Sequence, residues 1–260
     1  MSFLIVVSLI CSMFSAANAA QEIDEINNAI QQNEAKWKAK DTSVSKLSPE
    51  ARSKRLGAIL PVSTGREKVL TAAPMALPVS VDWRNYAGNN YVTPVKEQGE
   101  CGICWAFATT AAFESSVLIS KNTPTVDLDL SEQVLASCGY AGTCFGGYID
   151  RASDFIRDFG LPVESCYPYA RTEGICADAC TNWQSDTNKI SDWFRVAATV
   201  DAIKYALYNY GPLVTILTAE GYHSASIVGY DDAEQTFIAS RAAGVPTGVR
   251  PDIPESPIVS

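Results

Sequence analysis

The sequence predicts an α+β fold with two lobes, because helical patterns come first along the chain and strand patterns follow. Between residues 104 and 210, apolar side chains recur at helical spacing, and the runs are bounded by capping residues. After Pro212 the pattern changes to short runs rich in β-branched residues, separated by turns. Helices followed by strands, rather than alternating with them, are typical of α+β proteins.

Four helices and three strands are expected in this region. Ser131 is the predicted N-cap of the second helix, and Gly160 and Gly211 are placed to end the third and fourth. The helices are expected over residues 104–120, 131–138, 148–160 and 200–210, and the strands over 213–218, 224–232 and 236–239.

The first 19 residues form an apolar run that is too short to cross a bilayer comfortably. The run ends in Ala17-Asn18-Ala19, which predicts a secretory signal peptide cleaved after Ala19, although a basic start is missing. An uncleaved anchor is the less favoured alternative. Export places the chain in an oxidising compartment, where disulfides persist.

Charge separates the next segment from the rest of the chain. Residues 20–76 contain nine Lys and Arg against seven Asp and Glu, whereas residues 77–260 contain eleven against twenty-two. We interpret residues 20–76 as a detachable pro-segment in front of an acidic body, with an ordinary N-terminal extension as the alternative. The acidic body argues against nucleic acid as a partner.

Two helices are expected within residues 20–76. An amphipathic helix is predicted over residues 21–40, and a short helix follows with Ser48 as N-cap and Pro49 in its first position. Gly57 is placed to end the short helix. A linker rich in Pro and small residues then leads to Leu77, where the body begins.

Seven cysteines remain once Cys11 leaves with the signal peptide, and an odd number in an exported protein leaves one thiol over. Three disulfides and one reactive cysteine are the simplest account. A metal site is not expected, because the chain has one His and no second Cys-x-x-Cys pair to complete four ligands. We therefore expect neither a metal nor an organic cofactor.

The stretch KEQGECGICWAF, residues 96–107, contains the candidate nucleophile. Cys104 begins a predicted helix, where unpaired backbone N–H groups and the helix dipole stabilise a thiolate and lower its pKa. His223, the only histidine, is the candidate base. Gln98 can aim its amide N–H at a developing oxyanion together with the backbone N–H of Cys104. A redox pair of Cys101 and Cys104 is the alternative interpretation.

Three further polar or aromatic residues are given structural roles. Trp105 is expected in the core, whichever function the chain has. Glu132 and Asp231 are expected to be solvated or to cap a helix or turn rather than to be catalytic.

These residues resemble the papain-like cysteine peptidases, which include the cathepsins. Residues 98–107 match the family motif Gln-Gly-x-Cys-Gly-x-Cys-Trp-Ala-Phe. Other stretches follow in family order: PVSVDWRN, LSEQVLASC, the Gly-Gly of CFGGY, YPY at 167–169 and IVGYDD. The resemblance covers about residues 77–238. It implies a helical left lobe and a β-barrel-like right lobe.

The resemblance implies a cysteine endopeptidase that is made as a zymogen and is secreted or delivered to a lysosome-like or vacuolar compartment. Its substrates would be proteins or peptides, its own pro-segment would be its inhibitor, and it is expected to be a monomer with no membrane contact after signal removal. Cys104 would be the nucleophile, His223 the base and Gln98 an oxyanion donor. The implied disulfides are Cys101–Cys144 and Cys138–Cys176, with Cys166–Cys180 expected as a third.

The chain departs from the family pattern in two places. His223 lies 119 residues after Cys104, whereas papain-like enzymes place this histidine about 130–150 residues downstream. The chain is shorter than its relatives between Pro212 and His223. In the relatives, this segment forms part of the wall of the main specificity pocket. No Asn follows His223, and SRAAG stands where relatives have Asn-Ser-Trp-Gly, whose Asn orients the imidazole. A catalytically inactive homologue is therefore an alternative function.

The tail, residues 239–260, is rich in Pro and small residues. It is not expected to continue a sheet, so the right lobe is expected to be incomplete.

A reading-frame slip would explain the tail. When the third base of each codon from Ser240 onward is read with the first two bases of the next, the genetic code allows two Trp-Gly pairs and a Gly-Tyr at the family's spacing. We expect the coding nucleotides to permit this run. Third bases that forbid Trp at both places would contradict the hypothesis.

Overall fold

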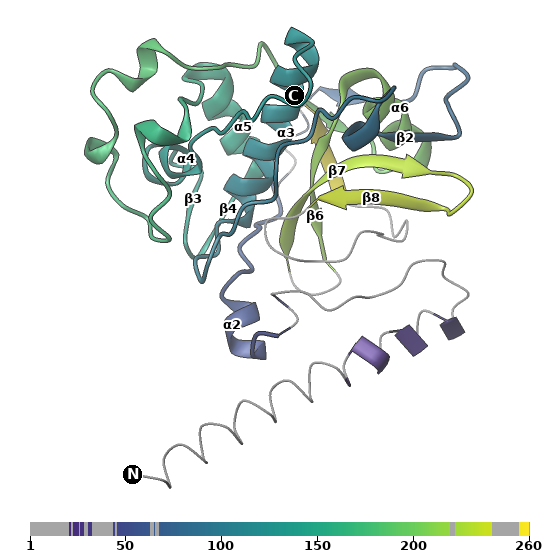
Figure 1. Cartoon of the computed structure of the whole chain (residues 1–260), viewed down its shortest axis with the longest axis horizontal. Coiled ribbons are helices and arrows are strands. Elements are labelled where there is room, and N and C mark those ends of the chain that lie inside the picture. The colour runs from purple at the N-terminus through teal and green to yellow at the C-terminus, as the bar shows by residue number, and fades with distance from the viewer. Residues whose placement is uncertain are drawn as a thin grey trace, which may run out of the picture.

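The computed structural model describes residues 21, 23–25, 27–28, 31–32, 44, 46–62, 65, 68–218, 222–240 and 255–259. The expected signal peptide lies outside these residues, as does much of the tail. Helices α4 (Glu132–Cys138) and α5 (Ile149–Asp158) lie on one side of the molecule and most of a sheet on the other, with α3 (Cys104–Lys121) between them (Figure 1). Within the described part of the chain, no helix combines the length and apolarity needed to cross a membrane.

The helical side is built around α3 (Cys104–Lys121), which packs against α4 (Glu132–Cys138) and α5 (Ile149–Asp158) and also against the sheet. Most of α3 is buried, because its sequence has apolar or small side chains on every face. The predicted caps are confirmed. The hydroxyl of Ser131 accepts the N–H of Val134, and Gly160, just beyond α5, has a left-handed backbone (φ 79°).

The sheet contains seven strands among the described residues, in the order β1-β5-β9-β6-β7-β2, with β8 paired to β7. Helix α6 (Val200–Tyr210) precedes β6 and ends at Gly211, as predicted. The strands are β1 (Val69–Leu70), β2 (Ser80–Asp82), β5 (Phe194–Val196), β6 (Leu213–Leu217), β7 (His223–Asp231), β8 (Thr236–Ser240) and β9 (Glu255–Val259). A separate two-stranded sheet consists of β3 (Gly142–Thr143) and β4 (Gly146–Gly147).

Two expectations for the sheet are wrong. The sheet formed by the described residues is open rather than closed into a barrel, because β1, β2 and β8 each pair with only one other strand. The tail does continue the sheet, since β9 pairs antiparallel with both β5 and β6. The register of β9 against β6 shifts between Ile258 and Glu255, and Pro257 lies within this shift. An irregularity of this kind accommodates a residue that has no N–H to donate.

The short helix α2 (Pro49–Ser53) confirms Ser48 as N-cap, because its hydroxyl accepts the N–H of Ala51. The helix ends at Ser53, so the expectation that Gly57 ends it is wrong. The described residues between 21 and 32 are helical, in agreement with the predicted first helix; most of its expected second half lies outside the described residues.

Three disulfides hold the loops around the helices: the two that the family resemblance implies and the third that was expected from the remaining cysteines. Cys104 is the free cysteine of the described chain. Because Cys101 is bonded to Cys144, Cys101 and Cys104 do not form the redox pair considered as an alternative. The disulfides are Cys101–Cys144, Cys138–Cys176 and Cys166–Cys180.

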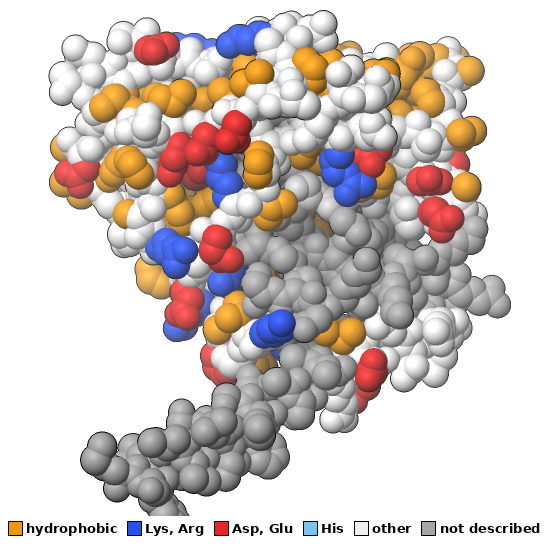
Figure 2. Space-filling view, viewed as in Figure 1, with side chains coloured by type: hydrophobic (Ala, Val, Ile, Leu, Met, Phe, Trp, Pro, Cys, Tyr) orange, Lys and Arg blue, Asp and Glu red, His pale blue; other side chains and the backbone are white. Residues whose placement is uncertain are grey.

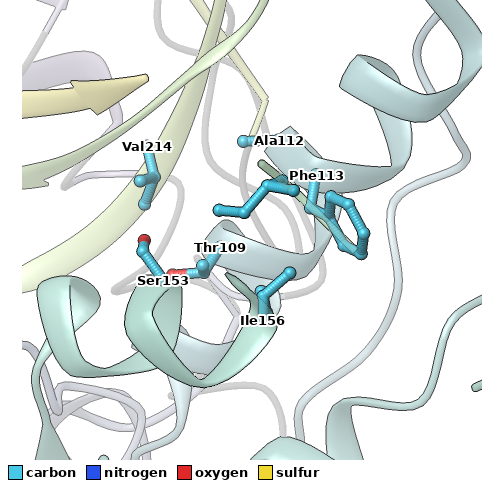
Figure 3. A pocket seen from close by; sticks show the side chains of 7 residues that line it. Thr109, Ala112, Phe113, Ser153, Ile156 and Val214 are labelled. Carbon is cyan, nitrogen blue, oxygen red and sulfur yellow. The ribbon is translucent and has the colours of Figure 1, made fainter. Parts of the chain in front are cut away.

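A small hollow lies where α3, α5 and β6 meet (Figure 3). Its walls are mainly apolar, and its two hydroxyls are already used within their own helices. Thr109 donates to the carbonyl of Trp105, and Ser153 donates to that of Ile149. The hollow is therefore a packing seam of the core rather than a binding site.

Candidate functional site

Cys104 is the first residue of α3, and its side chain is fully buried. The backbone N–H of Ser224 donates to Cys104 Sγ over 3.4 Å. Ser224 follows His223 at the start of β7. The fold therefore brings the nucleophile predicted from the sequence next to the strand end that carries the predicted base, although 119 residues separate them in the chain.

The loop before α3 is held by a disulfide and by close backbone packing. The N–H of Gly102 donates to the carbonyl of Cys144 over 2.8 Å, beside the Cys101–Cys144 bond. A Cβ atom at Gly102 would lie 2.6 Å from the oxygens of Cys144 and Leu56, so only glycine fits. On the other side, the Ser226 hydroxyl donates to the carbonyl of Ala108, which fastens β7 to α3.

Gln98 lies in the same loop and is completely buried. Its amide Nε2 donates to the carbonyls of Cys101 and Arg55, over 3.0 Å each. We call residues 54–59 the covering segment. The amide of Gln98, the predicted oxyanion donor, therefore bonds the carbonyl of Arg55 in this segment, which lies within the expected pro-segment (residues 20–76).

The covering segment runs between the two halves of the molecule and over the thiol. On one side, the N–H groups of Gly57 and Ala58 donate to the carbonyl of Tyr222, over 3.3 and 3.0 Å. On the other side, Ile59 donates to the carbonyl of Gly147, and Gly147 donates back to the carbonyl of Gly57. The N–H of Gly57 also faces the sulfur of Cys104. An extended chain therefore closes the site with main-chain hydrogen bonds.

Two glycines allow this close approach. A Cβ atom at Gly57 would lie 1.7 Å from the carbonyl oxygen of Gly102, and one at Gly147 would lie 2.4 Å from the ring of Trp105. Trp105 is fully buried in the core, which confirms its expected role. The close contact of Gly57 with the backbone of Gly102 could not be predicted from the sequence, because no local pattern distinguishes a glycine at such a contact from one at a helix end.

Ion pairs reinforce the covering segment. Arg55 Nη1 lies 2.6 Å from Glu97 Oε1, and Lys54 Nζ lies 2.8 Å from Glu100 Oε2. Both pairs join a basic residue of the segment to an acidic residue of the loop that carries Gln98. The Lys54 pair is exposed and contributes little to stability, whereas Arg55 is largely buried.

The surface outside this contact has mixed charge. On the face shown in Figure 2, basic side chains are scattered among acidic ones and form no continuous basic patch.

Burial raises the pKa of the Cys104 thiol, and the backbone N–H groups of Ser224, Gly57 and Trp105 offset only part of the rise. The lowered pKa that the helix start predicts for Cys104 is therefore wrong while the covering segment is in place. The covering segment excludes water from the sulfur, so the thiolate loses its solvation. His223 is also nearly buried, with 9% of its surface exposed.

Glu132 is not solvated, contrary to expectation, but is 2% exposed and lies 2.8 Å from Lys96 Nζ. Burial raises the pKa of Glu132 to about 8; Lys96 opposes the rise, and Glu114 and Glu164 add to it. Asp231 agrees with its expected capping role, since its carboxylate accepts the N–H groups of residues 233 and 234.

The chain matches known proteins over most of its length. Residues 77–239 match the family described as papain family cysteine protease. Digestive cysteine proteinase 3 of Homarus americanus is 30% identical over 232 residues, which cover 84% of this chain and 68% of the relative. Cysteine proteinase 2 of Zea mays is 41% identical over 134 residues, which span 49% of this chain but only 35% of the relative.

Solved structures extend the likeness to the fold. The digestive procathepsin L2 proteinase from the larval midgut of Tenebrio molitor superposes with a TM-score of 0.78 at 22% identity, covering 94% of this chain and 90% of that structure. The recombinant stem bromelain precursor gives a TM-score of 0.74 at 24% identity. Both are precursor forms, and at this identity they show the fold alone. With the family match over residues 77–239, these findings show that the chain belongs to the papain family of cysteine proteases.

Proposed function

We propose that the chain is the precursor of a cysteine endopeptidase that hydrolyses proteins or peptides. One observation carries the proposal: the N–H of Ser224 reaches Cys104 Sγ, so the only free thiol of the described chain lies beside the segment with the only histidine. A thiol at a helix start and an imidazole that exchanges protons near neutral pH are the two groups that thiol-based acyl transfer requires.

Each residue then has a defined task. The Cys104 thiolate attacks the scissile carbonyl carbon, and the carbonyl oxygen becomes an oxyanion that the Gln98 amide and the Cys104 N–H hold. His223 gives its proton to the leaving amine, which leaves an acyl group on Sγ. Water, deprotonated by His223, attacks this acyl group and releases the acid and the thiol. Gln98 already donates to a main-chain carbonyl at this position.

The precursor is latent because its own chain occupies the site. The covering segment binds Gly147 and Tyr222 through main-chain hydrogen bonds, as an extended peptide substrate would. It also keeps the thiol buried and its pKa raised. We propose that residues 1–19 direct export, that residues 20–76 form the pro-segment, and that its removal near residues 70–78 opens the site in a secreted or vacuolar compartment.

A non-catalytic homologue is the competing proposal, and it rests on the stretch SRAAG, residues 240–244, which stands where relatives have Asn-Ser-Trp-Gly. Without a group that orients the imidazole, proton transfer is slowed even where the fold is intact. The sulfur remains accessible to reagents in such a homologue, but peptide hydrolysis is lost.

Titration with an active-site-directed epoxide separates the two proposals. After removal of residues 20–76, we expect the inhibitor to block one thiol and to abolish hydrolysis of a peptide substrate at the same stoichiometry. The control Cys104→Ser should show neither effect. Hydrolysis that survives in Cys104→Ser would overturn the assignment of the nucleophile, and a blocked thiol without any prior hydrolysis would establish the non-catalytic homologue.

A further inference from the structure

Ser224 carries a buried hydroxyl that the mechanism proposed above does not use. The residue is 1% exposed, and its Oγ has no hydrogen-bond partner of standard geometry among the described residues. Ile216, its neighbour across the strand pair of β6 and β7, offers no polar side-chain group. A buried hydroxyl without a partner destabilises a fold, so its presence requires an explanation.

The alignment of β7 with α3 places this hydroxyl beside the nucleophile. Ser224 and Ser226 are two residues apart on β7, so their side chains lie on the same face of the strand. The Ser226 hydroxyl donates to the carbonyl of Ala108, which lies four residues after Cys104 on α3. Two strand residues and four helix residues both span about 6–7 Å. Ser224 therefore lies opposite Cys104, as Ser226 lies opposite Ala108.

The contacts of the sulfur agree with this alignment. The backbone N–H of Ser224 donates to Cys104 Sγ over 3.4 Å. Burial raises the pKa of the Cys104 thiol, and the Ser224 side chain is among the groups that lower it. A serine hydroxyl rotates about its C–O bond, so its proton can turn towards the sulfur when the sulfur becomes negative. A hydrogen bond to such a charged acceptor is about twice as strong as one between neutral groups.

We propose that Ser224 donates its hydroxyl, as well as its backbone N–H, to the Cys104 thiolate. Ser224 is then a further catalytic residue, because it touches the atom that attacks the substrate. The inference deepens the proposed function and rests on it, since a stabilised thiolate matters for catalysis only if Cys104 is the nucleophile.

These two donors make the thiolate less dependent on the imidazole. An imidazolium stabilises a neighbouring thiolate only while it keeps its proton, whereas a hydroxyl and an amide donate throughout the neutral range. The difference matters in this chain, because SRAAG, residues 240–244, stands where relatives have the Asn that orients the imidazole. We therefore expect Cys104 to ionise readily once uncovered, even if His223 is poorly oriented.

Alkylation of Cys104 in the full chain tests the proposal, because iodoacetamide reacts with the thiolate rather than the thiol. The rate is followed on the peptide that contains Cys104, and the midpoint of its pH profile gives the pKa of the sulfur. In Ser224→Ala, we expect the midpoint to rise by about one pH unit, since a donor to the charged sulfur is lost. Ser224→Thr, which keeps a hydroxyl, should restore the midpoint of the unsubstituted chain.

Ser226→Ala is the matched control, because it removes a hydroxyl from the same face of the same strand. That hydroxyl binds the carbonyl of Ala108 and fastens β7 to α3. Ser226→Ala should therefore lower the melting temperature and leave the midpoint of the alkylation profile unchanged. A purely structural role of Ser224 would produce the same pattern in Ser224→Ala.

Other ionisable groups around the sulfur are common to all these variants, so their titration does not alter the comparison. Opening of the covering segment, which admits the reagent, changes the height of the profile rather than its midpoint. These groups are His223, the ion pairs Arg55–Glu97 and Lys54–Glu100 of the covering segment, and Glu255, which lies two strands from Ser224 in the register of the sheet.

An unchanged midpoint in Ser224→Ala, or an equal rise in Ser226→Ala, would overturn the proposal. If Ser224→Ala does not fold, Ser224→Val is compared with Ser224→Thr, because the two side chains have the same shape and differ in the hydroxyl; equal midpoints would then overturn it. None of these measurements requires hydrolysis. A raised midpoint in a chain that does not cleave peptides would support the hydroxyl donor and contradict the proposed function, so the two can fail separately.

Discussion

Replacing Gly57 with Ala is expected to uncover Cys104 in the unprocessed chain. The new Cβ would lie 1.7 Å from the carbonyl oxygen of Gly102, and backbone atoms cannot move aside as a side chain does. Overpacking of this kind costs about 1–3 kcal/mol, which corresponds to about fivefold to 150-fold weaker docking of the covering segment. We expect alkylation of Cys104 by iodoacetamide to accelerate in the same proportion.

Ala72→Ser is the control for this experiment. It adds one side-chain atom within residues 20–76, at an exposed position outside the covering segment. Its alkylation rate should equal that of the unsubstituted chain. If Gly57→Ala leaves the rate unchanged as well, the close contact with Gly102 does not hold the segment over the thiol.

Replacing Lys96 with Met should lower the free energy of unfolding by about 3–5 kcal/mol, because it leaves buried carboxylates without their counter-charge. Glu114 and Glu132 are almost fully buried, and both depend on the Lys96 ammonium. Denaturant unfolding, compared with that of the unsubstituted chain, measures the loss.

Lys121→Met serves as the comparison, since Lys121 is exposed and bonds only the side chain of Asn188. Its loss should stay below about 0.5 kcal/mol, as is usual for surface substitutions. Similar small losses for both variants would show that the Lys96 cluster does not stabilise the fold.

The helices could be predicted from the sequence because their ends are marked locally. Ser131 and Gly160 act within one or two turns of their own positions, and the structure places both where the pattern indicated. The tail could not be predicted in the same way. Whether β9 joins a sheet depends on β5 and β6, which are far away in the chain, and an irregular register accommodates Pro257.

In the candidate site, too, the sequence could predict the residues but not the surroundings that tertiary contacts create. The residue types of Cys104, His223 and Gln98 limit their chemistry, so the sequence could nominate them before their positions were known. The direction of the pKa shift of Cys104 could not be predicted from the sequence. It depends on the covering segment, which is distant in the chain and buries the sulfur.

Because β1 pairs with β5, the position of the proposed maturation cut also determines whether β5 keeps a neighbouring strand on that side. Residues Val69–Leu70 lie before the expected start of the mature body, yet the main chain at 68–70 accepts the N–H groups of Arg195 and Ala197. A cut before β1 leaves β5 paired on this side, whereas a cut after β1 removes the acceptors of these two N–H groups and exposes β5 as an edge strand that can pair with another chain. If the pro-segment is removed as proposed, we expect the position of the cut to determine whether the mature protein self-associates.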